Sequence, residues 1–242
     1  MGAGPRTAVL IHGLGNSSDS WWQVGPVLAE HGYHVLAVDL PGHGRSAPLD
    51  RYSSAALAAA VVAAVPASPA LAIGHSLGGL VLAHAVGELR PELAVYEDLA
   101  WILSPDPVVA DSFRRQKNWT LEDLEREQPR WSERSRRHKL DALAAWDPRI
   151  VDHLGTFTLA PVDEAVVPSL LVLTDPSRLI PPDRAEELVQ RGFDVRVVAG
   201  AGHVVHFDDP AGFVAALASR GVVGNDHVGN TFRDKLELPP LP

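Results

Sequence analysis

Short apolar runs alternate with longer helical patterns through the first hundred residues of the chain. The runs are rich in valine and leucine and predict strands at 7–11, 34–40, 70–74 and 93–98, while the stretches between them predict helices at 24–31, 53–65 and 77–89. A strand, a helix and a strand at this spacing are typical of a parallel sheet. Strands that are apolar throughout are expected where helices cover both faces of the sheet.

The alternation stops at about residue 102, where charged residues concentrate in DSFRRQKNW, TLEDLEREQPRW and SERSRRHKLDALAAW. No strand pattern interrupts this region, and Thr120 and Ser132 are good helix N-caps because acidic residues follow each of them. We therefore expect two or three amphipathic helices. The charge is typical of a solvated helical face, and the functional alternatives are a lid over a site or a docking surface for a partner.

The strand and helix pattern resumes at residue 168. Strands are expected at 168–174 and 194–199, and helices at 182–192 and 209–219. The predicted fold class is therefore α/β, a mostly parallel sheet flanked by helices, with a core made of residues 1–101 and 168–220 and a helical cap inserted at 102–167. Residues 221–242 are polar and end in prolines, as expected of a C-terminal tail.

Composition and charge narrow the classes of function. The 242 residues are 46% hydrophobic and 21% charged, which excludes a disordered or fibrous chain. The formal net charge of -9 disfavours binding to nucleic acid, because phosphates repel an acidic surface. There is no cysteine, so disulfides and thiolate chemistry are excluded. The longest alanine- and valine-rich stretch, 55–65, is too short to span a bilayer and no secretion signal is recognisable, so we expect a cytoplasmic protein without a membrane partner.

The strongest chemical signal is GHSLG at 74–78, which fits G-x-S-x-G between a predicted strand and a predicted helix. In this context the serine occupies a sharp turn that lifts its hydroxyl above the sheet, and bulkier neighbours than glycine would clash. Ser76 is therefore the expected nucleophile. The Leu77 amide at the start of the helix and the Leu14 amide in the loop HGLG at 12–15 are the expected donors to an oxyanion.

A serine nucleophile needs a histidine base, and in proteins with this motif the base follows later in the chain. His203 lies in AGAGHVVHFDDP, directly after the predicted strand 194–199 and among glycines that let a loop residue swing towards Ser76. His206 is three residues further on, and we expect it to pack or to cap a helix. The two histidines could bind a metal together, but no third ligand presents itself, so no metal site is predicted.

Four motifs follow one another in the chain: HGLGNSSDSWW at 12–22, DLPGHGRS at 39–46, GHSLGG at 74–79 and GAGHVVHFDDP at 200–210. In these motifs and their order the chain resembles the α/β-hydrolase superfamily. The resemblance implies the α/β-hydrolase fold, a helical cap inserted after the sixth strand of the standard sheet, and a serine hydrolase that uses no cofactor. The chain departs from the family in starting at what would be the third standard strand, without the usual N-terminal hairpin.

The resemblance leaves three residues for the acid of the catalytic triad. Most relatives place an aspartate after the penultimate strand, but the position aligned on the Ile180-Pro181 pair holds Ser177, and Asp175 comes two residues early. The second solution of the family is an acid at the end of the strand that follows the nucleophile helix, and Asp98 ends that strand. We therefore favour Asp98, with Asp175 and Glu97 as the alternatives. Glu97 is expected to point away from the site, since neighbours on a strand face opposite sides.

These residues predict a serine hydrolase that cleaves a carboxylic ester or a lactone of a small-molecule substrate through an acyl-enzyme. A serine at the elbow argues against haloalkane dehalogenase or epoxide hydrolase chemistry, in which relatives use a carboxylate nucleophile. One alternative is another serine-dependent reaction on the same fold: C–C bond, thioester or amide hydrolysis, or perhydrolysis. The other is a non-catalytic, hydrolase-like protein that binds a ligand. The sequence is compatible with a homo-oligomer as well as with a monomer.

Overall fold

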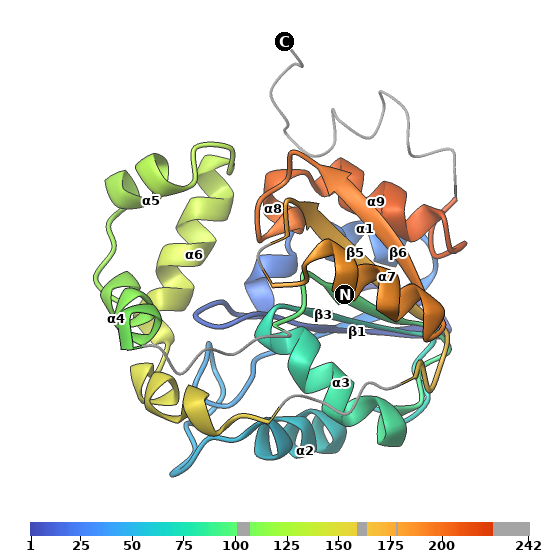
Figure 1. Ribbon diagram of the computed structural model, residues 1–242, viewed down its shortest axis with the longest axis horizontal. Helices are drawn as coiled ribbons and strands as arrows, with labels where there is room; N and C mark the ends of the chain where they lie inside the picture. The colour runs from blue at the N-terminus through green and yellow to red at the C-terminus, as the bar shows by residue number, and fades with distance from the viewer. Residues whose placement is uncertain (101–106, 159–163, 178, 225–242) are drawn as a thin grey trace.

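A computed structural model describes residues 1–100, 107–158, 164–177 and 179–224. Its centre is a sheet of six parallel strands in the order β2-β1-β3-β4-β5-β6 (Figure 1). The mostly parallel α/β sheet predicted from the sequence is confirmed, and each strand falls where the apolar runs predict one. The strands are β1 (Arg6–Ile11), β2 (Tyr33–Val38), β3 (Leu71–His75), β4 (Ala94–Glu97), β5 (Ser169–Asp175) and β6 (Phe193–Ala199).

Helices cover both faces of the sheet. Successive strand residues alternate between two apolar clusters, one on each face. Val9 and Ile11 of β1 belong to the cluster that includes α2, α3 and α7, whereas Ala8 and Leu10 belong to the cluster that includes α1 and α9. The strands are therefore apolar on both sides, which explains why their sequences show no polar alternation. These helices are α1 (Val24–Glu30), α2 (Ser54–Ala64), α3 (Leu77–Leu89), α7 (Pro182–Gln190) and α9 (Pro210–Ala218).

The direction in which the sheet grows reverses between β1 and β3. The chain first adds β2 on one side of β1 and then adds β3, β4, β5 and β6 in turn on the other side. In open parallel sheets, ligands bind beyond the carboxyl ends of the strands at such a reversal. The loop that follows β1 and the turn that follows β3 are the segments at this place, and they are the segments in which the sequence predicts the oxyanion donors and the nucleophile.

A group of helices lies between β4 and β5 in the chain and to one side of the sheet (Figure 1, green to yellow). Thr120 and Ser132 cap α5 and α6 as predicted, since each side chain accepts a hydrogen bond from the backbone N–H three residues on. Leu143 and Trp146 belong to the same apolar cluster as α2 and α3. Residues 102–106 and 159–163 of the predicted insert lie outside the described residues. The elements are α4 (Pro107–Gln116), α5 (Leu121–Glu127), α6 (Glu133–Ala145) and the 3₁₀ helix η2 (Pro148–Thr156).

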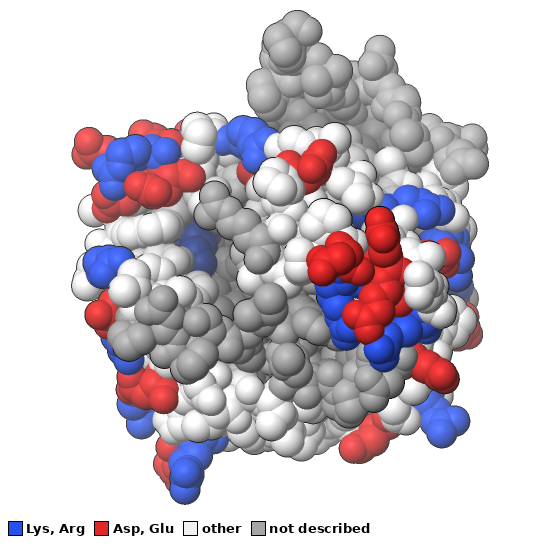
Figure 2. Space-filling model, in the orientation of Figure 1, with Lys and Arg blue, Asp and Glu red and all other residues white. Residues whose placement is uncertain are grey.

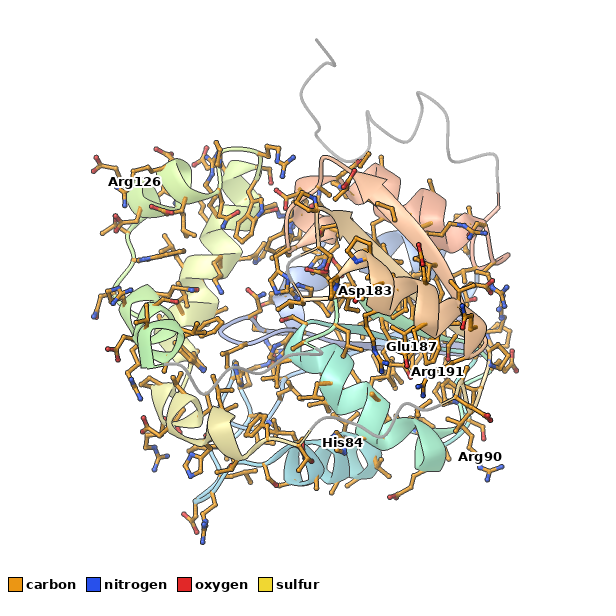
Figure 3. The ribbon with its side chains drawn as sticks, viewed as in Figure 1. His84, Arg90, Arg126, Asp183, Glu187 and Arg191 are labelled. Carbon is orange, nitrogen blue, oxygen red and sulfur yellow. The ribbon has the colours of Figure 1, made fainter. Side chains whose placement is uncertain are left out.

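Many charged side chains on the outer faces of the helices pair with one another. On α5, Arg126 forms ion pairs with Asp123 at 2.8 Å and with Glu127 at 3.2 Å. At the C-terminal end of α7, Glu187 and the capping residue Arg191 lie side by side and form an ion pair (Figure 3). Exposed pairs of this kind contribute little to stability, because water screens the charges. They are typical of a solvated helical face and do not by themselves indicate a partner.

The described chain ends in a packed segment. Val222 and Val223 are buried in the cluster that includes α1 and α9, so the first residues of the predicted tail pack against the sheet layer. The rest of that tail, at 225–242, lies outside the described residues. Within the ranges that the structure describes, no helix is both long enough and apolar enough to cross a membrane.

Candidate active site

Ser76 occupies the turn between β3 and α3 and has a positive φ of 50°. This backbone conformation is uncommon for a residue with a side chain and persists only where the surroundings hold it. The turn is tight, because a Cβ at Gly74 would lie 2.4 Å from the carbonyl oxygen of Gly78, and a Cβ at Gly78 would lie 2.3 Å from the carbonyl oxygen of Ile11. Both glycines are therefore required for α3 to follow β3 so closely.

Three side chains from separate segments of the chain meet at this turn. His203 Nε2 lies 2.9 Å from Ser76 Oγ, and His203 Nδ1 lies 2.6 Å from Asp98 Oδ2. Asp98 is buried, whereas the His203 side chain is 45% exposed. Because a carboxylate can only accept, Nδ1 carries the proton and Nε2 is free to accept the proton of the Ser76 hydroxyl. The structure thus brings together the three residues that the sequence favours as a triad.

The register of the sheet explains why Asp98 reaches the histidine. β3 and β4 are neighbours, and His75 is paired with Glu97. The next residue of each strand, Ser76 and Asp98, therefore leaves the sheet beside the other. The Asp98 N–H donates to the Val172 carbonyl at 2.8 Å, which extends the pairing with β5 by one residue and fixes the backbone from which the carboxylate projects.

Ser177 occupies the position where the resemblance would place the acid, and its hydroxyl donates to Asp98 Oδ1 at 2.7 Å. The same oxygen accepts hydrogen bonds from the backbone N–H groups of Leu179 at 3.3 Å and Ile180 at 3.0 Å. Because these two groups occupy its acceptor sites, the hydroxyl proton is left for Asp98. Asp175 is exposed at the end of β5. The role of Ser177 was not predicted, and a hydroxyl at the aligned position is the only signal for it in the sequence.

Glu97 faces the other side of β4 and pairs with His206. Its Oε2 lies 2.7 Å from His206 Nδ1, and its Oε1 accepts the backbone N–H of His206 at 2.9 Å. Both side chains are buried, and the His206 ring stacks on Trp21 with ring centroids 4.3 Å apart. Glu97 thus holds α8 (Val205–Asp208), the short helix that follows His203. Among the described residues, no group of three or more His, Cys, Asp or Glu side chains is placed to hold a metal ion.

The loop that follows β1 lies against the nucleophile turn. A Cβ at Gly13 would lie 2.6 Å from His75 Nδ1 and 3.2 Å from Ser76 Cβ, so only glycine permits this approach. Within the described part of the chain, the amide N–H groups of Leu14 and Leu77 donate no backbone hydrogen bond. Leu77 is the first residue of α3, where free N–H groups and the helix dipole favour a negative charge. That the Leu14 and Leu77 amides bind an oxyanion is therefore still a prediction.

Buried neutral histidines support this loop. His12 Nε2 accepts a backbone N–H at 3.0 Å, and His43 Nε2 accepts the Gly15 N–H at 3.2 Å. Burial lowers the pKa of His12 to about 4 and the pKa of His43 well below its ordinary value, so both rings are neutral at pH 7 and keep the lone pairs that these bonds need. Burial likewise lowers the pKa of His75, which precedes the nucleophile.

One charged residue beside this loop was not predicted. Lys139 of α6 is buried, and its Nζ donates to the Gly15 carbonyl at 2.9 Å. Burial lowers the pKa of its ammonium group to about 7. In the sequence this lysine lies within the charged run SRRHKLDA, which predicts a solvated helix and carries no sign of burial.

The alpha/beta hydrolase family matches the chain over residues 8–216. Two curated relatives match shorter stretches. The chain is 43% identical over 84 residues to the pimeloyl-[acyl-carrier protein] methyl ester esterase of Edwardsiella ictaluri, which is 35% of this chain and 32% of that protein. It is 33% identical over 123 residues to the putative protein-lysine deacylase ABHD14B of Rattus norvegicus, which is 48% of this chain and 58% of that protein. The matches thus span about a third and somewhat more than half of these relatives.

Among solved structures, the chain is similar to the N-formylmaleamic acid deformylase of Pseudomonas putida S16. The TM-score is 0.74 over 89% of this chain and 92% of that chain, at 21% sequence identity. It is also similar to an esterase of Exiguobacterium antarcticum, with a TM-score of 0.72 over 91% of this chain and 92% of that chain, at 17% identity. At these identities the likeness concerns the fold alone.

Proposed function

The chain belongs to the alpha/beta hydrolase family, and from that premise we propose that it is a serine hydrolase that cleaves a carboxylic ester or a lactone of a small organic substrate through an acyl-enzyme. The observation that carries the proposal is the hydrogen-bonded series from Asp98 through His203 to Ser76. A carboxylate, an imidazole and a hydroxyl in this order are the groups that acyl transfer needs. The relatives named as an esterase and a putative deacylase support the same class of reaction.

In the first half of the reaction, Ser76 Oγ attacks the carbonyl carbon of the substrate. His203 Nε2, 2.9 Å away, takes the hydroxyl proton as the new C–O bond forms. The imidazolium that results is stabilised by Asp98, whose burial keeps water from screening the interaction. His203 then gives the proton to the leaving alcohol oxygen, and the acyl group stays on Ser76.

The tetrahedral intermediate carries a negative charge on the former carbonyl oxygen, and we assign its stabilisation to the Leu14 and Leu77 amides. The close approach of Gly13 to Ser76, between the segments that carry them, supports this assignment. Leu77 begins α3, whose N-terminus favours a negative charge. Loss of one donor of this kind typically costs about 10²–10³ in kcat.

In the second half of the reaction, a water molecule attacks the acyl-enzyme. His203 accepts the water proton and returns it to Ser76 Oγ, so the acid product leaves and the resting enzyme is restored. In a lactone the alcohol oxygen stays attached to the acyl chain. The product is then one hydroxy acid, whereas an ester yields an acid and a separate alcohol.

A panel of p-nitrophenyl esters, lactones and thioesters tests the proposal. We expect turnover of an ester or a lactone and a loss of several orders of magnitude in Ser76→Ala, with unchanged thermal unfolding. Ser112→Ala is the matched control, since among the described residues that hydroxyl bonds only to the Val109 carbonyl of α4. A Ser76→Ala protein that retains more than about a tenth of the activity would contradict the assignment, because little turnover survives loss of a triad nucleophile. Turnover confined to thioesters would favour the other serine-dependent reactions.

A further inference from the structure

Lys139 is a buried basic residue in contact with the proposed oxyanion loop. It is 6% exposed, and its Nζ donates to the Gly15 carbonyl at 2.9 Å. Nζ also lies 3.4 Å from where a Cβ on Gly15 would be. Gly15 comes two residues after Gly13, which packs against Ser76, and two residues of chain span at most about 7 Å. Lys139 therefore lies within the length of a small substrate from the nucleophile.

Lys139 has more hydrogen-bond donors than the described residues have acceptors for. A lysine ammonium has three N–H donors. Within the described residues, the Gly15 carbonyl is the one acceptor that Lys139 meets. Lys117 shows the contrasting arrangement, because its Nζ donates to three carbonyl oxygens at the end of α6, at 2.8, 2.8 and 2.6 Å. Lys117 is thus fully used by the fold, whereas the described residues leave two donors of Lys139 for a ligand.

No carboxylate in the described part of the chain forms an ion pair with Lys139, in contrast to Arg137 on the outer face of the same helix, which pairs with Glu133. Among the described residues, the titratable groups that face Lys139 are His12, His43 and His75, and burial lowers the pKa of all three, so they are neutral at pH 7. A positive charge on Lys139 is therefore not balanced by these neighbours. An anion that entered beside it would regain the electrostatic stabilisation that burial removes.

Figure 2 shows the surface hollowed between the inserted helices and the rest of the molecule, with blue side-chain atoms set back inside the hollow. From the position, the free donors and the unbalanced charge, we propose that Lys139 binds a carboxylate group of the substrate beside the oxyanion loop. This proposal rests on the proposed hydrolase function and narrows its substrates to esters or lactones that carry a negative charge. Lys139 is then a specificity-determining residue and not a catalytic one.

Pairs of substrates that differ only in this charge test the proposal. Mono-p-nitrophenyl adipate and its methyl ester place the charge on the acyl side, and 4-acetoxybenzoate and its methyl ester place it on the alcohol side. We expect a higher kcat/KM for the charged member of at least one pair. Lys139→Met should lower the ratio of kcat/KM between the charged and the neutral member of that pair about 10- to 100-fold, as for loss of a charge-assisted hydrogen bond. Arg137→Met removes an exposed charge from the same helix and should leave that ratio unchanged.

A second variant separates the charge from the contact with the loop. In Lys139→Gln the side chain keeps hydrogen-bond donors but has no charge, and we expect it to lose the preference as Lys139→Met does. In the wild type, the ratio of kcat/KM between charged and neutral substrates should fall as pH rises above about 7, where the free enzyme loses the ammonium proton. Any effect of pH on the chemical step is common to both members of a pair and cancels from the ratio.

Calorimetric binding of adipate to the Ser76→Ala protein needs no turnover and separates this proposal from the hydrolase function. We expect Lys139→Gln to weaken that binding at least tenfold. Equal losses on charged and neutral substrates would overturn the proposal, and so would a wild type that neither prefers a charged substrate nor binds adipate; Lys139 would then only join the helix to the loop. Adipate binding that depends on Lys139 in a protein without hydrolase activity would support the anion site and overturn the hydrolase function.

Discussion

Replacing Lys139 by methionine removes a buried charge, and the effect on stability should depend strongly on pH. Burial lowers the pKa of Lys139 to about 7, from 10.5 for an ordinary lysine. Between these two values the unfolded chain holds a proton that the folded chain has lost, so the free energy of unfolding of the wild type rises with pH. Below about pH 7 both states are charged, and the full cost of burying the charge is present.

The size of the effect follows from the pKa difference, since one pKa unit corresponds to about 1.4 kcal/mol. Burial of the amine costs about 4 kcal/mol at pH 7, where the folded amine is half protonated, and about 2 kcal/mol at pH 9, where it is neutral. Methionine fills a similar volume without a charge, so this pH-dependent cost disappears in the variant. The difference in stability between Lys139→Met and the wild type should therefore shift by about 2 kcal/mol from pH 7 to pH 9.

Urea unfolding at pH 7, 8 and 9 measures this shift. We expect Lys139→Met to gain most over the wild type at pH 7 and least at pH 9. Arg137→Met is the control, because an exposed guanidinium keeps its proton throughout this range, and its difference from the wild type should stay constant. If Lys139→Met differs from the wild type by the same amount at pH 7 and pH 9, the lysine is not desolvated and the reasoning about its surroundings is wrong.

Three further predictions concern the residues around the proposed triad. Asp98→Asn should lower kcat by about 10³–10⁴ in steady-state assays, because the amide cannot hold the productive histidine tautomer, whereas Asp175→Asn should cost about tenfold or less; the reverse order would make Asp175 the acid. Ser177→Ala should lower kcat about tenfold through the lost hydrogen bond to Asp98, and an unchanged kcat would deny that support. Glu97→Gln should lower the free energy of unfolding by about 3 kcal/mol, because it breaks a buried pair with His206, and unchanged urea unfolding would contradict that anchoring.

The fold and the placing of three site residues follow from short-range patterns in the sequence. Apolar runs mark the strands because helices cover both faces of the sheet, and the glycines around Ser76 mark a turn that only small residues allow. The position of Asp98 also follows from local information. It ends the strand after the nucleophile helix, and neighbouring parallel strands bring their ends to the same edge of the sheet, as the pairing of His75 with Glu97 bears out.

Short-range sequence patterns do not predict which residues of distant segments are in contact. Lys139 and Gly15 are 124 positions apart, and a lysine in a charged run predicts a solvated face because periodicity does not reveal which turn of a helix meets a loop. Ser177 and Asp98 are 79 positions apart, and nothing in the local sequence distinguishes a serine that donates a hydrogen bond to a distant carboxylate from any other serine. The pairing of Glu97 with His206 depends on which way two strand-end neighbours point. The alternation of side chains along a strand predicts that Glu97 and Asp98 point to opposite faces of the sheet. It does not predict which residues they bond to, which are His206 and His203.

Labelling with a fluorophosphonate tests most directly whether Ser76 is an activated nucleophile. Such probes bond covalently to an activated serine oxygen and need no knowledge of the substrate. We predict that the wild-type protein is labelled rapidly on one peptide, that mass spectrometry places the label on Ser76, and that Ser76→Ala is not labelled while Ser112→Ala is. A wild-type protein that stays unlabelled, or a label that persists in Ser76→Ala, would contradict the assignment.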